Sequence, residues 1–292
     1  MACSRVRIAC VGDSLTRGDG LHEHPPKRRV LAWRLSKRNM IMRERGNYPM
    51  LLSRLLGRKF FDVRNFGRGA STACNLSAGQ GPPYTSTPHY AAALRFQPHV
   101  VVLMLGTNDA KGHLWRGRCQ GAFKSSYTMI VRAFLTADNP PKLLVVLKPP
   151  PMLGARVFGI ERALLGDVGG SIEKAVADIV SRQQRHTLPY ATQVVLAPPL
   201  PMSSTDDAIF TYDRLHLNAN GSGLVACAAH TSLRALAQRR SLRELWRDAA
   251  SSCSGEGGIA PSLARSCFDP FCTDPSREDP DGTGVRVHRC TE

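Results

Sequence analysis

The chain has 292 residues, and its 42% hydrophobic and 21% charged side chains supply enough apolar material for a substantial core, which excludes wholesale disorder. Its 39 Lys and Arg exceed its 23 Asp and Glu by 16, so nucleic acid or an acidic surface is the first class of partner to consider. The longest uninterrupted aliphatic run, residues 100–105, is far shorter than the roughly 20 residues that a membrane-spanning helix requires.

The cysteines and the N-terminal sequence bear on the cellular compartment. Arg5 and Arg7 interrupt the first apolar stretch, so the sequence lacks the pattern of a secretory signal. Nine cysteines cannot all pair within one chain, and the first five are scattered singly, as buried thiols usually are. We therefore predict a reducing compartment and a cytoplasmic location. These five are Cys3, Cys10, Cys74, Cys119 and Cys227.

Short aliphatic runs alternate with segments of helical periodicity along the chain. Each run has the length of a strand and ends in Gly, Pro or Asn. The predicted strands cover residues 6–11, 60–66, 99–105, 143–147 and 193–197. The predicted helices cover residues 49–56, 90–95, 123–135, 172–184 and 223–239.

This alternation predicts the fold class. Parallel strands need crossover connections, which helices provide, and the run at residues 99–105 has no polar alternation, as expected for a strand buried on both faces. We predict a flavodoxin-like, three-layer α/β/α sandwich around a five-stranded parallel sheet.

Two regions depart from the regular layout. Residues 21–46 form a basic insertion, placed between the first strand and the first helix, and its segment 27–45 has eight Lys and Arg against one Glu. We assign residues 1–245 to one domain and residues 246–292 to a flexible tail rich in Cys, Pro and Gly. The tail cysteines allow two disulfides, zinc binding with His288 nearby, or free thiols, and the absence of a C-x-x-C pair disfavours zinc. They are Cys253, Cys267, Cys272 and Cys290.

Polar residues follow the predicted strands, where an open parallel sheet binds its ligands. Ser14 comes after the first strand, Gly69 after the second and Asn108 after the third. Asp213 and His216 come after the fifth strand and just before the last helix. Loops at the carboxyl ends of parallel strands converge, so we expect these residues to share one site.

These residue types supply the parts for acyl transfer. A serine hydroxyl is a poor nucleophile until a base takes its proton, and His216 is the candidate base. One turn of chain can bring Asp213 against one imidazole nitrogen, which leaves the other nitrogen to face Ser14. The backbone N–H groups of Ser14 and Gly69 and the side-chain amide of Asn108 are candidate oxyanion donors, each worth about 2.7–4 kcal/mol of barrier in comparable enzymes.

Four sequence blocks resemble those of the SGNH hydrolase family, also called GDSL lipases and esterases. They are VGDSLTRG at 11–18, NFGRGAST at 65–72, LGTND at 105–109 and DRLHLN at 213–218. The resemblance spans residues 6 to about 240. It implies that Ser14 is nucleophile and oxyanion donor, that Gly69 and Asn108 complete the oxyanion hole, and that Asp213 orients His216, the base and then the acid.

Two departures and one alternative concern these blocks. Gly67 and Gly69 both offer an N–H group, and alignment with the family favours Gly69. Arg214 stands where many members have Gly or another small residue. Taken alone, Ser14 reads as a helix cap, but four ordered blocks make that interpretation the weaker one.

The sequence thus predicts a serine esterase that forms an acyl-enzyme and needs no metal or organic cofactor. No extended apolar lid segment is visible, which favours short acyl or O-acetyl esters as small-molecule substrates. The family resemblance leaves two alternatives, a lysophospholipase and an acyl-thioesterase.

A different class of function is also considered. A catalytically idle protein of the same fold would bind anionic membranes or RNA through residues 27–45, although Trp33 is the only aromatic ring in that segment and no nucleic-acid motif accompanies it. A solvated basic loop is the simpler interpretation of this segment.

Overall fold

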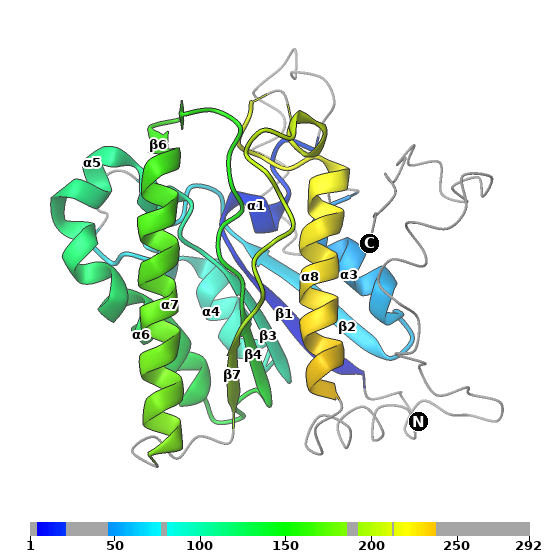
Figure 1. The fold of residues 1–292 in the computed structure, drawn as a ribbon. Coiled ribbons are helices and arrows are strands. Elements are labelled where there is room, and N and C mark those ends of the chain that lie inside the picture. Colours follow the sequence, from blue (N-terminus) through cyan, green and yellow to red (C-terminus); the bar gives the residue numbers. More distant parts are fainter. Residues whose placement is uncertain (1–4, 22–45, 77–80, 186–191, 212, 238–292) are drawn as a thin grey trace, which may run out of the picture.

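The computed structural model describes residues 5–21, 46–76, 81–185, 192–211 and 213–237 (Figure 1). Residues 22–45, which hold most of the basic insertion, and the residues from 238 onward lie outside the described part of the chain. The prediction of a separate C-terminal tail therefore falls on residues that are not described. Within the described ranges, no helix combines the length and apolar character needed to cross a bilayer.

A five-stranded parallel sheet forms the centre of the molecule, as predicted. The strand order β2-β1-β3-β4-β7 places β1 and β3 in the interior of the sheet, and every residue of β3 is buried. The uninterrupted apolar composition of β3 follows from this position, since helices cover both of its faces. The strands are β1 (Val6–Gly12), β2 (Phe61–Gly67), β3 (Val100–Met104), β4 (Leu143–Val146) and β7 (Gln193–Leu196).

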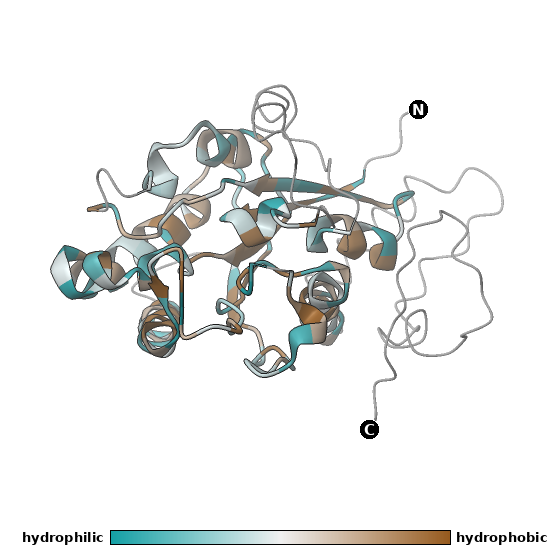
Figure 2. Cartoon of the chain, turned by 90° about the horizontal axis from the view of Figure 1, so that it is seen from above, coloured by the Kyte–Doolittle hydropathy of each residue, from teal (hydrophilic) through white to brown (hydrophobic). Residues whose placement is uncertain are grey.

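Five longer helices cover the two faces of the sheet. One hydrophobic cluster joins one face to α3 (Tyr48–Leu56) and α8 (Ala219–Ala237). A second cluster joins the other face to α4 (Pro88–Arg95), α6 (Gln120–Leu135) and α7 (Arg162–Gln184). Brown apolar segments run through the strands and the helices beside them (Figure 2). The three-layer α/β/α sandwich is confirmed.

Helix α7 begins ten residues earlier than its apolar spacing predicts. Gly166, Gly169 and Gly170 interrupt the hydrophobic pattern of its first half, and glycine has low helix propensity. Leu164 and Val168 are nevertheless buried against the sheet, so packing overrides propensity in this segment.

Several short elements were not expected from the sequence. The first helix is α1, and the basic insertion follows α1 instead of following the first strand directly. Asp13 caps the N-terminus of α1, and Gly18, with φ of 94°, ends it after four residues, too few for a recognisable period. These elements are α1 (Ser14–Arg17), η1 (Tyr84–Ser86), η2 (Asn108–Ala110), α5 (Gly112–Leu114), the π-helix η3 (Trp115–Cys119), β5 (Arg156–Val157), β6 (Ile160–Glu161) and η4 (Asp207–Ile209).

The expectation that the early cysteines are free buried thiols is wrong for three of them. Cys74 and Cys119 form a disulfide across 45 residues, and Cys227 is also disulfide-bonded. Cys10 is a buried free thiol in the described part of the chain. Single scattered cysteines carry no sequence signal of pairing, because pairing depends on which loops the fold brings together.

Candidate active site

The register of the sheet brings three of the predicted site residues to one edge. Gly12 of β1 lies opposite Gly67 of β2 on one side and Met104 of β3 on the other. These three strands therefore end level with one another, and Ser14, Gly69 and Asn108 follow them directly.

A tight turn presents Ser14 at the end of β1. The Asp13 carboxylate accepts a hydrogen bond from the Leu15 N–H at 3.0 Å, which makes Asp13 the cap and Ser14 the first residue of α1. The N–H of a first helical residue has no acceptor within the helix, so it is available to a ligand. Gly12 allows this turn, because a Cβ there would lie 2.0 Å from Thr16 Oγ1 and 2.5 Å from the Met104 carbonyl oxygen.

The loop after β2 packs against α1 and contains Gly67 and Gly69, the two candidate glycine donors. The Gly67 N–H already donates to Asn65 Oδ1 at 2.8 Å. The Gly69 N–H donates to no acceptor within the described ranges, so of these two glycines Gly69 has the free donor. A Cβ on Gly67 would lie 2.3 Å from the Arg17 backbone nitrogen, so the close approach of α1 to the end of β2 requires glycine there.

Asn108 and Asp109 connect β3 to the same loop. The Asn108 side-chain amide donates to the Ser71 carbonyl at 3.1 Å, which leaves its second N–H for another acceptor. The buried Asp109 carboxylate accepts from the N–H groups of Ala73 at 2.9 Å and Cys74 at 2.8 Å. Burial raises the pKa of Asp109 to about 6, although both hydrogen bonds favour the ionised form.

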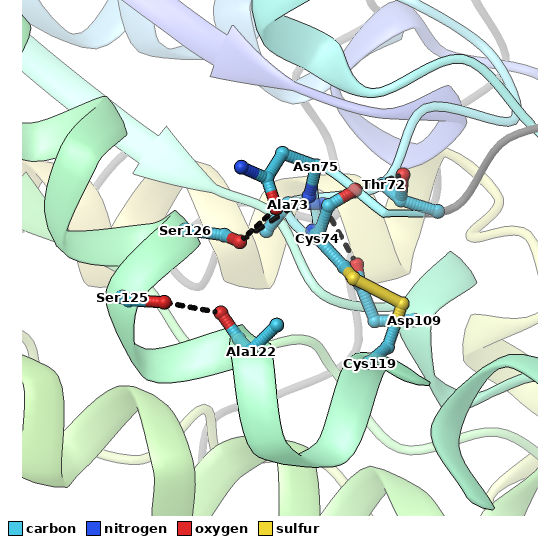
Figure 3. The surroundings of a disulfide bond; sticks show 9 residues. All are labelled: Thr72, Ala73, Cys74, Asn75, Asp109, Cys119, Ala122, Ser125 and Ser126. Atoms are coloured by element: carbon cyan, nitrogen blue, oxygen red, sulfur yellow. Dashed lines mark hydrogen bonds between the residues drawn. A yellow bond between two sulfur atoms is a disulfide. The ribbon is translucent and has the colours of Figure 1, made fainter. Parts of the chain in front are cut away.

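The Cys74–Cys119 disulfide fixes the far end of this loop. It joins the loop after β2 to the π-helix η3, and Figure 3 shows Asp109 beside it. On the side of α6, the hydroxyl of Ser126 donates to the Asn75 side chain at 2.8 Å. The loop that contains Gly69 is therefore tied to the chain after β3 by a covalent bond and by side-chain hydrogen bonds.

Asp213 and His216 form the pair that their spacing predicts. Asp213 Oδ2 lies 2.6 Å from His216 Nδ1, while Asp213 Oδ1 accepts from the His216 N–H at 2.8 Å and the Leu215 N–H at 3.0 Å. Arg214 adopts a left-handed φ of 65°, a conformation that favours glycine.

The electrostatics of the pair suit a base. Burial disfavours the charged imidazole, but the hydrogen bond and the negative charge of Asp213 outweigh burial, and the pKa of His216 is raised. Burial acts in the opposite direction on Asp213, yet the hydrogen bond and positive charge of His216 hold the pKa of this carboxyl below its usual range. His216 Nε2 is buried and has no hydrogen-bond partner among the described residues.

Gly20 links the histidine to the serine turn. With φ of 84°, Gly20 packs so closely that a Cβ on it would lie 2.7 Å from His216 Cβ. Asp13 and Asp19 also lie close enough for their charges to help raise the pKa of His216. The chain just after Ser14 and the loop with Asp213 and His216 are therefore neighbours.

Three contributors to the site were missed at the level of sequence: Asp13 as a buried cap, Asp109 as the anchor of the Gly69 loop, and Gly20 as the contact of His216. Asp13 and Asp109 flank Ser14 and Asn108, and this adjacency was the available signal. His99 has a structural role, because its Nδ1 accepts a hydrogen bond from the Arg7 N–H at 3.0 Å. Within the described ranges, no group of three or more His, Cys, Asp or Glu is arranged to hold a metal ion.

Fold and site together define an α/β/α sandwich with serine, histidine and aspartate at the carboxyl edge of its parallel sheet. The chain belongs to the GDSL-like Lipase/Acylhydrolase family, which matches residues 10–224.

Individual proteins are similar to this chain in sequence or in fold. An acetylxylan esterase of Xylanibacter ruminicola is 34% identical over 111 residues, a stretch that covers 38% of this chain and 18% of that relative. The fold is similar to a carbohydrate acetylesterase of Sinorhizobium meliloti, with a TM-score of 0.55, 19% identity and coverage of 80% of this chain and 100% of that one. It is also similar to an aryl esterase of M. smegmatis, with a TM-score of 0.53, 18% identity and coverage of 79% and 99%.

Proposed function

We propose that this protein is a serine esterase that hydrolyses carboxylic esters through an acyl-Ser14 intermediate. The observation that carries the proposal is the 2.6 Å contact between Asp213 and His216, on a loop that packs against the chain following Ser14. The buried, unpartnered Nε2 of His216 is the atom that would accept the serine proton.

The proposed reaction has two halves. Ser14 Oγ attacks the ester carbonyl carbon while His216 Nε2 takes its proton, and the resulting oxyanion accepts hydrogen bonds from the N–H groups of Ser14 and Gly69 and the amide of Asn108. The tetrahedral intermediate collapses, and His216 gives the proton to the leaving alcohol. Water then attacks the acyl group with His216 again as base, which releases the acid and restores Ser14.

Asp213 has two functions in this scheme. It accepts the Nδ1 hydrogen, which fixes the tautomer that leaves Nε2 free to accept a proton, and its charge stabilises the imidazolium that forms. His216 is neutral, and therefore able to act as base, only above its raised pKa.

A Ser14→Ala variant tests the nucleophile. We expect turnover of p-nitrophenyl acetate to fall by about 10⁴-fold or more, because the acyl-enzyme can no longer form. Ser125→Ala, at an exposed position on α6, is the matched control and should keep wild-type turnover. A fluorophosphonate probe should label the wild type and the control but not Ser14→Ala; undiminished turnover by Ser14→Ala would refute the proposal.

We infer that the substrates are esters of short acyl groups, with O-acetyl esters first. The relatives whose names state an acetylesterase activity support this choice. A panel of p-nitrophenyl esters with acyl chains of two to sixteen carbons, together with lysophospholipid and acyl-thioester substrates, tests it. Preference for long-chain lysophospholipid or for the thioester would favour the lysophospholipase or acyl-thioesterase alternative.

We further propose that residues 1–245 act as the hydrolase domain, and that residues 27–45 attract anionic membranes or polyanions to it. The support is the charge of this segment, eight Lys and Arg against one Glu. Deletion of residues 27–45 should abolish salt-dependent retention on anionic vesicles and leave esterase activity in place. If the wild type is retained on the vesicles and neither the wild type nor the deletion variant has esterase activity, the idle binding protein is favoured instead.

The cytoplasmic location stays a prediction, and the Cys74–Cys119 disulfide removes the thiol argument for it, because disulfides persist mainly in oxidising compartments. Alkylation of free thiols in the native host before lysis tests it. Labelled Cys74 and Cys119 would support a reducing compartment, and an intact disulfide would contradict one.

A further inference from the structure

An exposed aromatic ring lies beside the proposed catalytic histidine. Phe158 is 64% exposed, and its ring centroid is 6.3 Å from that of His216, with the two planes tilted by 46°. Single exposed apolar residues are common on protein surfaces and need no function. The position of Phe158 is what distinguishes it, since its ring borders the only imidazole that the proposed reaction uses.

The backbone under this ring is strained. Phe158 and Gly159 form the turn between β5 and β6, with φ of 50° and 80°. Turns of this type favour Asn or Asp followed by Gly, and a bulky residue at positive φ is sterically unfavourable. A large apolar side chain here therefore opposes both the local backbone preference and the preference for polar residues in exposed turns.

The hairpin is anchored on two sides. Its tip is held by the Gly112 N–H, which donates to the Gly159 carbonyl at 3.1 Å, and its second strand by Arg116, which donates to Glu161 at 3.0 Å. The segment that precedes the hairpin is tied to the loop with Asp213 and His216, because the Leu153 N–H donates to the Arg214 carbonyl at 3.0 Å. The ring is thus presented from a fixed backbone between the chain after β3 and the loop with His216.

The reaction geometry decides which part of an ester would meet this ring. His216 Nε2 must reach the oxygen of the leaving alcohol in order to protonate it, so the alcohol lies on the imidazole side. The oxyanion donors after β1, β2 and β3 lie on the carbonyl-oxygen side. A group adjacent to the imidazole is therefore next to the alcohol, not next to the oxyanion.

A purely structural role, in which the Phe158 ring supports His216, is a weaker explanation for its position. A centroid separation of 6.3 Å is near the outer limit of aromatic pairs, and most of the Phe158 surface remains open. Asp213 already holds His216 through both its ring and its backbone.

We propose that Phe158 is a substrate-binding residue that stacks on the ring of the leaving alcohol, and so selects esters of ring-bearing alcohols. The inference rests on the proposed esterase function. The shared chemistry is a flat ring face, which both an aryl group and the C–H face of a pyranose provide.

The test varies the alcohol and keeps the acyl group constant. Phenyl acetate, an acetylated xylo-oligosaccharide and ethyl acetate all give the same acetyl-Ser14 intermediate. We expect Phe158→Ala to lower kcat/KM about 3- to 10-fold for one or both ring-bearing esters relative to ethyl acetate, and Phe158→Tyr to retain the wild-type ratio. Loss confined to phenyl acetate would identify an aryl group as the partner, and loss confined to the xylo-oligosaccharide would identify a sugar.

The rate of deacylation distinguishes a role of Phe158 in binding the alcohol from a role in positioning His216. Because the alcohol has already left, the hydrolysis rate of acetyl-Ser14 should be the same in Phe158→Ala and in the wild type. Met129→Ala, at another exposed apolar residue, should change nothing. The proposal would be overturned if Phe158→Ala lost the same kcat/KM on all three esters, if it deacylated more slowly, or if it did not change at all. Failure of the esterase proposal looks different: the wild type would then be no more active than Ser14→Ala.

Discussion

At the scale of single residues, close backbone approach determines which side chains the site tolerates. A Cβ on Gly12 would lie 2.5 Å from the Met104 carbonyl oxygen, and a Cβ on Gly67 would lie 2.3 Å from the Arg17 backbone nitrogen. The ends of β1 and β2 and the start of α1 therefore approach their neighbours this closely only because both positions are glycine. Gly20 has the same function between the serine turn and the histidine. These close backbone approaches therefore set the relative position of the groups proposed to react.

Gly20→Ala should reduce activity far more than its strain alone explains. Gly20 and Gly57 have nearly equal positive φ angles, 84° and 87°, but a Cβ on Gly20 meets His216 and a Cβ on Gly57 has open space. Gly57→Ala should lose about 1–2 kcal/mol of unfolding free energy from backbone strain, and Gly20→Ala somewhat more, because its Cβ also meets His216. We expect only Gly20→Ala to lower kcat, by about 10-fold or more, because a small misplacement of the base slows proton transfer.

Chemical denaturation and p-nitrophenyl acetate turnover, measured on both glycine variants, check this prediction. Equal kcat values for the two would show that Gly20 does not set the position of His216.

At the scale of elements, the site depends on loops fastened to helices rather than on the strands alone. The loop after β2 carries Gly69, and the disulfide from Cys74 and the carboxylate of Asp109 hold its second half (Figure 3). The hairpin β5-β6 is fastened in a similar way to the chain after β3. Both irregular segments are held by contacts with the chain that follows the central strand.

Replacing Cys74 and Cys119 together with Ser should destabilise the protein. A cross-link that spans 45 residues restricts the unfolded chain, and its loss should lower the unfolding free energy by about 2–4 kcal/mol. Denaturant unfolding of the wild type and of the double variant, without reductant, measures this difference.

Reductant supplies the control for the disulfide. It acts on the Cys227 disulfide in both proteins alike, so the two unfolding free energies should converge when reductant is present. Identical stability of the two proteins without reductant would mean that the Cys74–Cys119 bond does not stabilise the fold.

At the scale of the whole molecule, folding places two carboxyl groups in the interior beside the site. Burial raises the pKa of Asp13 to about 6 and that of Asp109 to about 6 as well. Between about pH 4 and pH 6 the folded protein holds protons that the unfolded chain has released. The contribution of these two carboxyl groups to the unfolding free energy is therefore greatest below pH 4. It falls as the pH rises to about 6 and is constant above that.

Asp13→Asn should remove one part of this pH dependence. The amide oxygen can still accept from the Leu15 N–H, but no buried charge forms. The stability of the wild type relative to the variant should fall by up to about 3 kcal/mol between pH 4 and pH 7, because the pKa shift spans about two units.

Urea unfolding at a series of pH values tests this expectation. Asp207→Asn, at an exposed carboxylate, is the control and should show no comparable trend. A wild-type advantage that stays constant or grows with pH would contradict burial as the dominant effect on Asp13.

The sequence by itself determined the sheet, its five main helices and the Asp213–His216 pair. Strand runs, helical periods and a three-residue spacing are local patterns, so they survive without knowledge of the fold. The four ordered blocks identified the family for the same reason.

Only the tertiary structure decided the pairing of Cys74 with Cys119, the anchoring of the Gly69 loop by Asp109, and the position of Phe158 beside His216. Each of these contacts joins residues far apart in the chain, through loops without a period of their own. Local patterns indicate which elements form, but the packing of those elements determines which loops meet.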